Sequence, residues 1–149
     1  MRVVIQRVTQ ASLHIENKLI SQIGKGMVTL LGIGYEDTED DINYLINKII
    51  RLRIFDDDNG VMNWDIDRIQ GEILLVSQFT LLANTRKGNR PSYIDAATPD
   101  VSKPLYNRFV TQLKSHLGDR VQTGIFGANM QVNLTNDGPV TIIIDSKLK

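Results

Sequence analysis

The 149-residue sequence contains no cysteine and only two histidines, His14 and His116. The absence of cysteine excludes disulfides, thiol nucleophiles and cysteine-ligated metal sites. It also fits a reducing compartment, so we expect a cytoplasmic protein. Neither histidine lies in a motif, so no Ser-His-Asp triad is indicated, and no His, Asp and Glu residues show metal-ligand spacing. The sequence therefore predicts no metal and no cofactor.

Long hydrophobic runs and an excess of one charge are also missing. No apolar run approaches the length of a membrane span and the N-terminus lacks a signal-peptide pattern, so we expect no membrane contact. Lysine and arginine together number 17, as do aspartate and glutamate, which gives zero net charge. Proteins that grip long duplexes are normally basic. Any contact with nucleic acid is thus expected to be local. The candidate residues for such a contact are Arg86, Lys87 and Arg90, although composition alone favours a solvated loop at these positions.

A glycine-rich phosphate loop is absent, and several predicted strands follow one another without a helix between them. Both features argue against a doubly wound nucleotide-binding fold. Helical spacing predicts one helix capped by Thr38 and a second over roughly Lys103–Leu117. Strands are predicted at 2–8, 12–16, 19–23, 27–33 and 72–82, with three more after the second helix. We expect one α/β domain over residues 1–149, built as a three-layer β/β/α sandwich of two packed sheets with two helices on one side.

The dipeptide Gly138-Pro139 stands inside a segment that otherwise has the pattern of two strands. Met130–Leu134 alternates apolar and polar residues, and Val140–Ile144 is almost entirely β-branched. Proline donates no hydrogen bond to a strand ladder and belongs at an edge, a bulge or a turn. A turn that starts the second strand is the commoner role of such a dipeptide. The alternative is that two backbone carbonyls are held at the mouth of a site, and a cis peptide bond would point them the same way.

A second candidate site begins where the apolar run Ile73–Val76 ends. That run predicts a strand buried on both faces, and polar residues follow it abruptly. By alternation Gln78 and Thr80 share one face of the strand, and Ser77 and Phe79 share the other. A central strand that turns polar at its end commonly opens into a pocket. A plain strand end with satisfied hydroxyls would show the same pattern.

These segments together resemble the D-aminoacyl-tRNA deacylases. The similarity rests on Ser77–Leu81 and Asn136–Thr141, and it extends to residues 5–8, 87–93 and 124–132 and to the chain length. Five segments match in the order of the family and cover nearly the whole chain, whereas residues 146–149 lie outside the pattern. The resemblance implies the same three-layer arrangement with barrel-like sheets. It also implies hydrolysis of the ester bond of D-aminoacyl-tRNA.

The resemblance assigns catalysis to the motif of Ser77, Gln78, Phe79 and Thr80. Backbone N–H groups there would hold the ester and stabilise its developing oxyanion. Much of the proton chemistry would be left to the RNA, whose ribose 2′-OH helps to activate water. Thr80 could instead act as a nucleophile, but nothing visible in the sequence would activate it.

The resemblance also implies that substrate-binding residues come from two subunits of a homodimer. A cis Gly138-Pro139 would reach into the partner, accept the α-ammonium of a D-residue and block any larger group. Arg7 would fix that loop through hydrogen bonds to backbone oxygens, for which a surface ion pair is the alternative. Phe126 and Met130 would wall the adenosine pocket. Because glycine has no side chain, such a filter could not reject glycyl-tRNA.

The expected function is therefore chiral proofreading at the acceptor end of tRNA, with mischarged glycyl-tRNA as an additional substrate. A different class of function would be a non-catalytic RNA-end or protein-binding module on a β scaffold. The neutral charge and the lack of aromatic stacking patterns disfavour the RNA-binding module.

Overall fold

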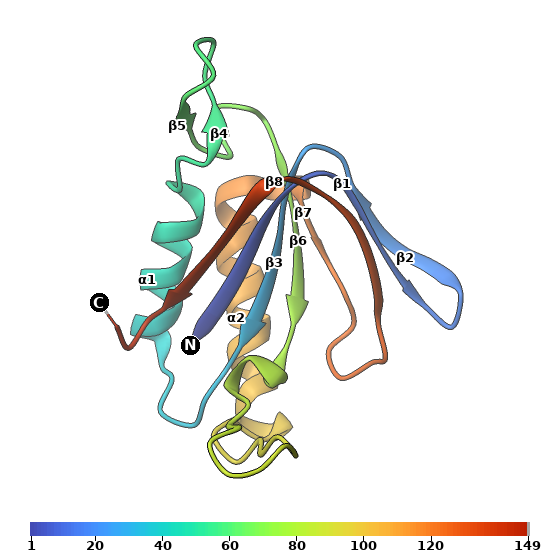
Figure 1. The fold of residues 1–149 in the computed structure, drawn as a ribbon, viewed down its shortest axis with the longest axis vertical. Coiled ribbons are helices and arrows are strands. Elements are labelled where there is room, and N and C mark those ends of the chain that lie inside the picture. The colour runs from blue at the N-terminus through green and yellow to red at the C-terminus, as the bar shows by residue number, and fades with distance from the viewer. Residues whose placement is uncertain (149) are drawn as a thin grey trace.

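The computed structural model describes residues 1–148, so Lys149, the last residue of the expected domain, lies outside the described residues. Two helices cover one face of a single large sheet (Figure 1). A small hairpin projects from one end of the domain. In chain order the elements are β1 (Arg2–Ile15), β2 (Lys18–Ile23), β3 (Gly26–Gly32), α1 (Glu39–Ile50), β4 (Phe55–Asp56), β5 (Met62–Trp64), β6 (Glu72–Ser77), the 3-10 turn η1 (Phe79–Leu82), α2 (Pro99–Leu117), the 3-10 turn η2 (Gly118–Arg120), β7 (Val121–Thr123) and β8 (Gln131–Asp145).

The large sheet has the strand order β2-β1-β3-β6-β7, and β8 pairs with the long strand β1. The pairs β3–β6 and β6–β7 are parallel, and the three pairs that involve β1 are antiparallel. Because β2 also contacts β6 and β7, the sheet curls almost closed upon itself. The expected α/β domain with a barrel-like sheet and two helices is confirmed.

The two sheet layers expected from the sequence are joined into one hydrogen-bonded sheet. β1 and β8 are long enough to take part in both halves of it. Their pairing shifts register between Gln6 and Val8 and again between Val8 and Gln10. Such bulges bend a strand and increase its twist, so β1 and β8 can pass from one layer to the other.

Gly138-Pro139 lies in the middle of one continuous strand, so the expectation of two strands joined by a turn was wrong. The peptide bond between Gly138 and Pro139 is cis. This agrees with the alternative hypothesis, in which the dipeptide holds two carbonyl groups at the mouth of a site. The ladder to β1 pairs Val8 with Asn136 and then Gln6 with Thr141. The residues between these two pairs have no partner in β1, so the proline removes no hydrogen bond from the ladder.

Both helices form where helical spacing predicts them. α1 starts at the N-cap Thr38, whose N–H bonds Asp41 Oδ2 at 2.8 Å in a capping box. Burial raises the pKa of Asp41, but hydrogen bonds from Ser146, the Thr38 N–H and Lys147 outweigh it and hold the pKa well below its usual value. α2 begins at Pro99, four residues before the expected start, because Thr98 is the N-cap and proline suits the first helical position.

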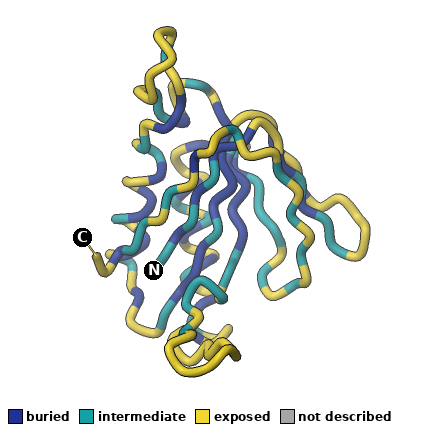
Figure 2. Tube along the Cα trace, in the orientation of Figure 1, coloured by how far each residue is buried: buried dark blue, intermediate teal, exposed yellow. Residues whose placement is uncertain are grey.

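The main core fills the space between the two helices and the sheet, where the strands and the inward helix faces are buried (Figure 2). The predicted stripe of α1 is part of this core, with Ile42, Leu45, Ile46 and Ile49 buried. A second, smaller cluster lies inside the curled part of the sheet and includes Val8, Leu13, Ile23, Val28 and Leu74. Of the helices formed by residues 1–148, none is long and apolar enough to cross a membrane.

Candidate active site

β6 ends at Ser77, and the turn η1 replaces the rest of the expected strand 72–82. Gln78 N still donates to Leu31 O of β3 at 2.8 Å, and Leu81 N then turns back onto Gln78 O at 3.2 Å. The first N–H groups of a helical turn have no acceptor within it. The N–H groups of Phe79 and Thr80 are therefore available to a ligand beside the end of β6.

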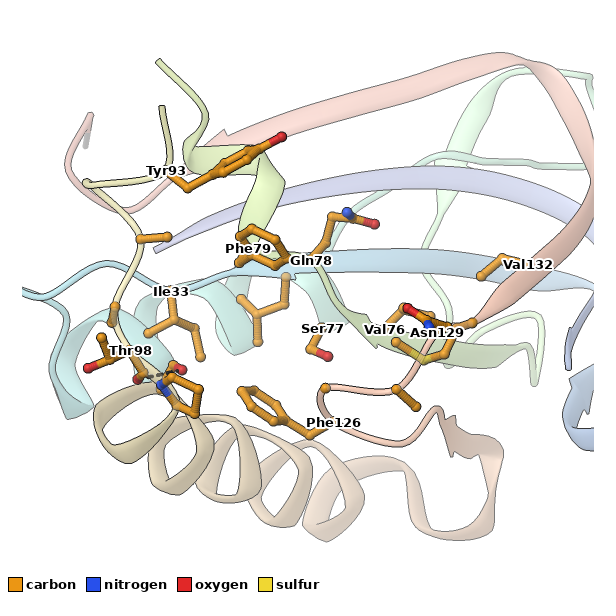
Figure 3. Close-up of a pocket in the computed structure, with 18 residues that line it drawn as sticks. Ile33, Val76, Ser77, Gln78, Phe79, Tyr93, Thr98, Phe126, Asn129 and Val132 are labelled. Carbon is orange, nitrogen blue, oxygen red and sulfur yellow. Dashed lines mark hydrogen bonds between the residues drawn. The ribbon is translucent and has the colours of Figure 1, made fainter. Parts of the chain in front are cut away.

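A pocket of about 630 Å³ opens beside η1, a size typical of small-ligand sites. Five of the predicted site residues line it: Ser77, Gln78, Phe79, Phe126 and Met130. In Figure 3, Phe79 and Phe126 lie on opposite sides of the hollow, with Ser77 between them. The other lining residues come from the ends of β3 and β6, from the start of α2 and the segment before it, and from the start of β8 and the segment before it: Leu31, Ile33, Val76, Tyr93, Ala96, Ala97, Thr98, Pro99, Ser102, Gly127, Ala128, Asn129 and Val132.

The lining set contains no Asp, Glu, His, Lys or Arg. The pocket therefore holds no side chain that is ready to act as a general base near neutral pH. No group of three or more His, Cys, Asp or Glu residues that could hold a metal ion occurs within residues 1–148. What the pocket offers a ligand is an apolar wall, hydroxyl and amide groups, and the N–H groups of η1.

The ring of Phe126 packs against the ring of Tyr106 in α2. Their ring centroids are 5.5 Å apart with an angle of 53° between the planes. The Tyr106 hydroxyl donates to Leu75 O of β6 at 3.3 Å, and burial raises the pKa of Tyr106 to about 12. Tyr106 is therefore uncharged near neutral pH, and it connects Phe126 in the pocket wall to β6, the strand that ends at Ser77.

Thr80 belongs to η1 but does not line the pocket. Its Oγ1 accepts a hydrogen bond from Gln78 Nε2, so the two side chains do lie together, as strand alternation predicted, although the backbone there is a turn. An amide N–H cannot take a proton from a hydroxyl. The contact therefore gives Thr80 no activating base, and its role as a nucleophile gains no support.

Gly138 and Pro139 do not line the pocket of their own chain, and both are exposed. In Figure 1 the bend of β8 lies at the upper end of the sheet, whereas β6 points its carboxyl end to the lower end. A Cβ atom at Gly138 would collide with Val140 N, so only glycine fits there. Within one chain, the structure keeps this dipeptide apart from the residues of the pocket.

Arg7 lies below this bend and is only 8% exposed. Its Nε donates to Asp137 O at 2.9 Å, and its Nη1 donates to Ile54 O at 2.7 Å and to Asp56 Oδ1 at 3.1 Å. The guanidinium thus joins the residue before Gly138 to the chain that leads into β4. Arg7 does pair with the carboxylates of Asp56 and Asp137, but it is buried and bonds backbone oxygens, so a surface ion pair is not an adequate description.

Asn136 holds the same bend from the other side. Its Nδ2 donates to Arg7 O at 2.9 Å and to Val140 O at 3.3 Å. The amide therefore bridges the gap in the β1–β8 ladder. Arg7 and Asn136 together fix both ends of the segment that holds Gly138 and Pro139.

The basic residues Arg86, Lys87 and Arg90 lie on an exposed loop. Two backbone hydrogen bonds between Asn84 and Ser92, of 2.8 and 2.9 Å, close the base of this loop. Throughout the part of the chain that the structure describes, the three charged groups form no ion pair and no side-chain hydrogen bond. Their charges are therefore free to meet an anionic ligand.

A family model described as D-Tyr-tRNA(Tyr) deacylase matches residues 4–145. The chain belongs to the D-Tyr-tRNA(Tyr) deacylase family. Two curated relatives, each called D-aminoacyl-tRNA deacylase, match over 149 residues, which is 100% of this chain and 99% of each relative. The protein of Flavobacterium psychrophilum is 60% identical, and that of Bacteroides thetaiotaomicron is 57% identical. The family resemblance noted in the sequence is confirmed.

Two solved structures are similar to this deacylase-family chain. A c-Myc DNA Unwinding Element Binding Protein superposes with a TM-score of 0.93 at 41% identity, covering 97% of this chain and 98% of its own. A "probable eukaryotic D-amino acid tRNA deacylase" superposes with a TM-score of 0.80 at 19% identity, covering 96% and 97% respectively. The second likeness supports the fold alone.

Several residues of this deacylase-family site could not be chosen from the sequence. Tyr93, Tyr106 and Asn136 reach the pocket or the β8 bend only through the fold. Thr98-Pro99, an N-cap followed by proline, did signal a helix start, and this start forms part of the pocket wall. The exposed aromatic pair of Phe79 and Tyr93 was not evident from the sequence either, because the two rings meet only in the fold.

Proposed function

We propose that this protein hydrolyses the ester bond of D-aminoacyl-tRNA and releases free D-amino acid and tRNA. The observation that carries the proposal is the turn at the end of β6, which offers two N–H groups beside a pocket of suitable size in a chain of this family. Carbonyl carbon attack creates an oxyanion, and N–H donors preorganised around it typically contribute 10²- to 10³-fold each to the rate.

The proton chemistry falls to the substrate in this proposal. The lining residues include no side chain that is ready to accept a proton from water at neutral pH. An aminoacyl ester is already activated, and the neighbouring ribose 2′-OH lies next to the carbonyl that water attacks. The protein then acts by holding the ester beside the start of η1, where Phe79 lines the pocket and the N–H groups of Phe79 and Thr80 have no acceptor within the turn.

Phe126 and Met130 are assigned to the wall that holds the terminal adenosine. Phe126 presents an aromatic face that Tyr106 holds from below. Bases of single-stranded RNA ends stack on such rings, whereas a flexible methionine fills the remaining gap. The free charges of Arg86, Lys87 and Arg90 are assigned to phosphates near the acceptor end.

Selectivity for D-residues is assigned to Gly138 and Pro139 of a partner subunit. A D-residue presents its α-ammonium where an L-residue presents its side chain, and carbonyl oxygens there would accept the ammonium and exclude a larger group. Two observations support action in trans: the dipeptide is held rigidly by Arg7 and Asn136, and it lies away from the pocket of its own chain. A filter of this kind admits glycyl-tRNA as well.

A two-fold homodimer would create two such sites. β8 pairs only with β1 among the described strands, so its other edge is open over a strand of 15 residues. Proteins usually cover long open edges, and a second copy of the chain is a common way to do so. We place the enzyme in the cytoplasm, where aminoacyl-tRNA is used.

The deciding experiment compares hydrolysis of D-tyrosyl-tRNA and L-tyrosyl-tRNA by the purified protein. We expect rapid release of tyrosine from the D-ester and none above background from the L-ester. Comparable cleavage of both esters would contradict the carbonyl filter. Cleavage of neither would favour a non-catalytic binding module.

Subunit mixing tests the shared site. A Gly138-Pro139 double-alanine variant and a Gln78-Phe79 double-alanine variant should each be inactive. After verified subunit exchange, a shared site predicts one intact site per heterodimer and partial recovery of activity. No recovery would place each site within one chain.

A further inference from the structure

An exposed aromatic pair lies on the rim of the pocket. The rings of Phe79 and Tyr93 meet edge to face, with centroids 5.0 Å apart and planes at 72° (Figure 3). Their residues are 56% and 41% exposed, although both also line the pocket. Large apolar groups exposed beside a pocket commonly mark a binding surface. The edge-to-face contact holds the two rings in place before any ligand arrives.

Tyr93 also connects the pocket to the basic loop. It directly follows Ser92, whose two backbone hydrogen bonds to Asn84 close that loop. The unpaired charges of Arg86, Lys87 and Arg90 extend from the other end of the same segment. Along the chain, Tyr93 therefore lies where the pocket wall meets the base of the basic loop.

We propose that Tyr93, held by Phe79, is the stacking surface for the cytidine base that precedes the terminal adenosine of the tRNA. The inference rests on the proposed function, because it assumes that the adenosine and the ester occupy the pocket. The next nucleotide then lies outside, on the rim, with its phosphate facing the basic loop. Aromatic side chains bind single-stranded bases in this way, and one stacked base changes affinity by roughly 10-fold or more.

The test uses two small substrates, 3′-O-D-tyrosyl-adenosine and the same ester on the dinucleotide cytidylyl-adenosine. The measured quantity is the ratio of kcat/KM for the dinucleotide ester to kcat/KM for the nucleoside ester. For the wild-type protein we expect a ratio of about 10. For Tyr93→Leu we expect a ratio near 1, because the aliphatic side chain offers no aromatic face.

Two variants serve as matched controls. Tyr93→Phe keeps the ring and should keep the wild-type ratio, since no hydrogen bond of the hydroxyl is found within residues 1–148. Tyr35→Leu removes another exposed tyrosine, which does not line the pocket, and should also keep the ratio. Melting temperatures and sedimentation of all variants report on folding and on the dimer.

The outcomes separate this inference from the function on which it rests. A wild-type ratio near 1, or a Tyr93→Leu variant that keeps the full ratio, would overturn the stacking surface while leaving deacylation in place. A Tyr93→Leu variant with a weakened dimer and an unchanged ratio would assign the rings to a subunit contact instead. If the wild-type protein cleaves neither these esters nor D-tyrosyl-tRNA, the proposed function itself is refuted and this inference falls with it; if it cleaves D-tyrosyl-tRNA alone, the function stands and the stacking surface is overturned.

Discussion

Replacing Arg7 with methionine removes the charged group that holds the Gly138-Pro139 segment. Methionine keeps much of the length and apolar volume of the buried side chain. In the native protein, Arg7 Nε donates to Asp137 O at 2.9 Å and Arg7 Nη1 donates to Ile54 O at 2.7 Å. The methionine variant leaves both carbonyl oxygens without this charged donor. Hydrogen bonds from charged groups contribute about 1.5–3 kcal/mol each. The ion pair with Asp56 adds little, because that carboxylate is half exposed.

The stability of the variant should fall by at least about 3 kcal/mol, the lower bound for the two backbone bonds together. The effect on selectivity comes from the contact with Asp137, because of the two backbone bonds of Arg7 only this one reaches the Gly138-Pro139 segment. Loss of one such bond allows a change of at least about 10-fold in the relative rates of D- and L-ester cleavage. We therefore expect Arg7→Met to lower the D/L ratio of kcat/KM by at least that factor.

Urea unfolding gives the stability, and D- and L-tyrosyl-tRNA hydrolysis gives the ratio. Arg120→Met is the matched control, since Arg120 also bonds one carbonyl oxygen, Gly71 O at 3.2 Å, and one carboxylate, that of Asp67. It should lose stability and keep the D/L ratio. If Arg7→Met loses at least about 3 kcal/mol but keeps the wild-type ratio, Arg7 is a structural residue and does not position a filter.

Further predictions concern catalysis, binding and pH. Thr80→Ala should keep most of the single-turnover rate, because its hydroxyl lies outside the pocket; a loss of several orders of magnitude, with an acyl-enzyme detected by mass spectrometry in the wild type, would establish a covalent route. Exhaustive chelation should leave the rate of D-tyrosyl-tRNA hydrolysis unchanged, and a restoration of lost activity by added metal would contradict this. Replacing Arg86, Lys87 and Arg90 with glutamine should flatten the salt dependence of tRNA affinity without altering the D/L ratio; an unchanged slope would leave them as solvated loop residues. The lowered pKa of Asp41 makes its ionised form a stabilising one, fully effective above the ordinary aspartate pKa of about 4 and lost as the pH falls through the lower folded value. Urea unfolding should therefore show stability declining in acid below about pH 4, with a shallower decline in Asp41→Asn.

The elements that the sequence predicted well are those fixed by neighbouring residues. The N-cap Thr38 and the apolar stripe of α1 follow from local hydrogen bonding and helical spacing. The polar end of β6 follows from an abrupt change after a buried run, and the structure places Ser77 and Gln78 on a pocket there. In each of these cases the residues that determine the local structure are close to one another in the sequence.

The features that escaped the sequence depend on contacts between distant residues. The residue pattern before and after Gly138-Pro139 fits two strands joined by a turn as well as it fits one continuous strand. Only the register in which β8 pairs with β1 shows that the strand is continuous. The alternation after Ser77 predicts a strand, but a hydrogen bond from Leu81 N back to Gln78 O makes this stretch a turn. Nothing in the sequence singles out Tyr106, because its contact with Phe126 joins two segments 20 residues apart.

The position of β1 in the sheet has a consequence for how the enzyme is made. This strand needs β8 along nearly its whole length, and β8 is translated more than 100 residues later. Contacts between such distant segments form slowly, because a long loop must close first. The guanidinium of Arg7 meets Asp137 only at that last step. A nascent chain can thus assemble α1 and much of the central sheet during synthesis, but its Gly138-Pro139 segment is held in place only after β8 has docked.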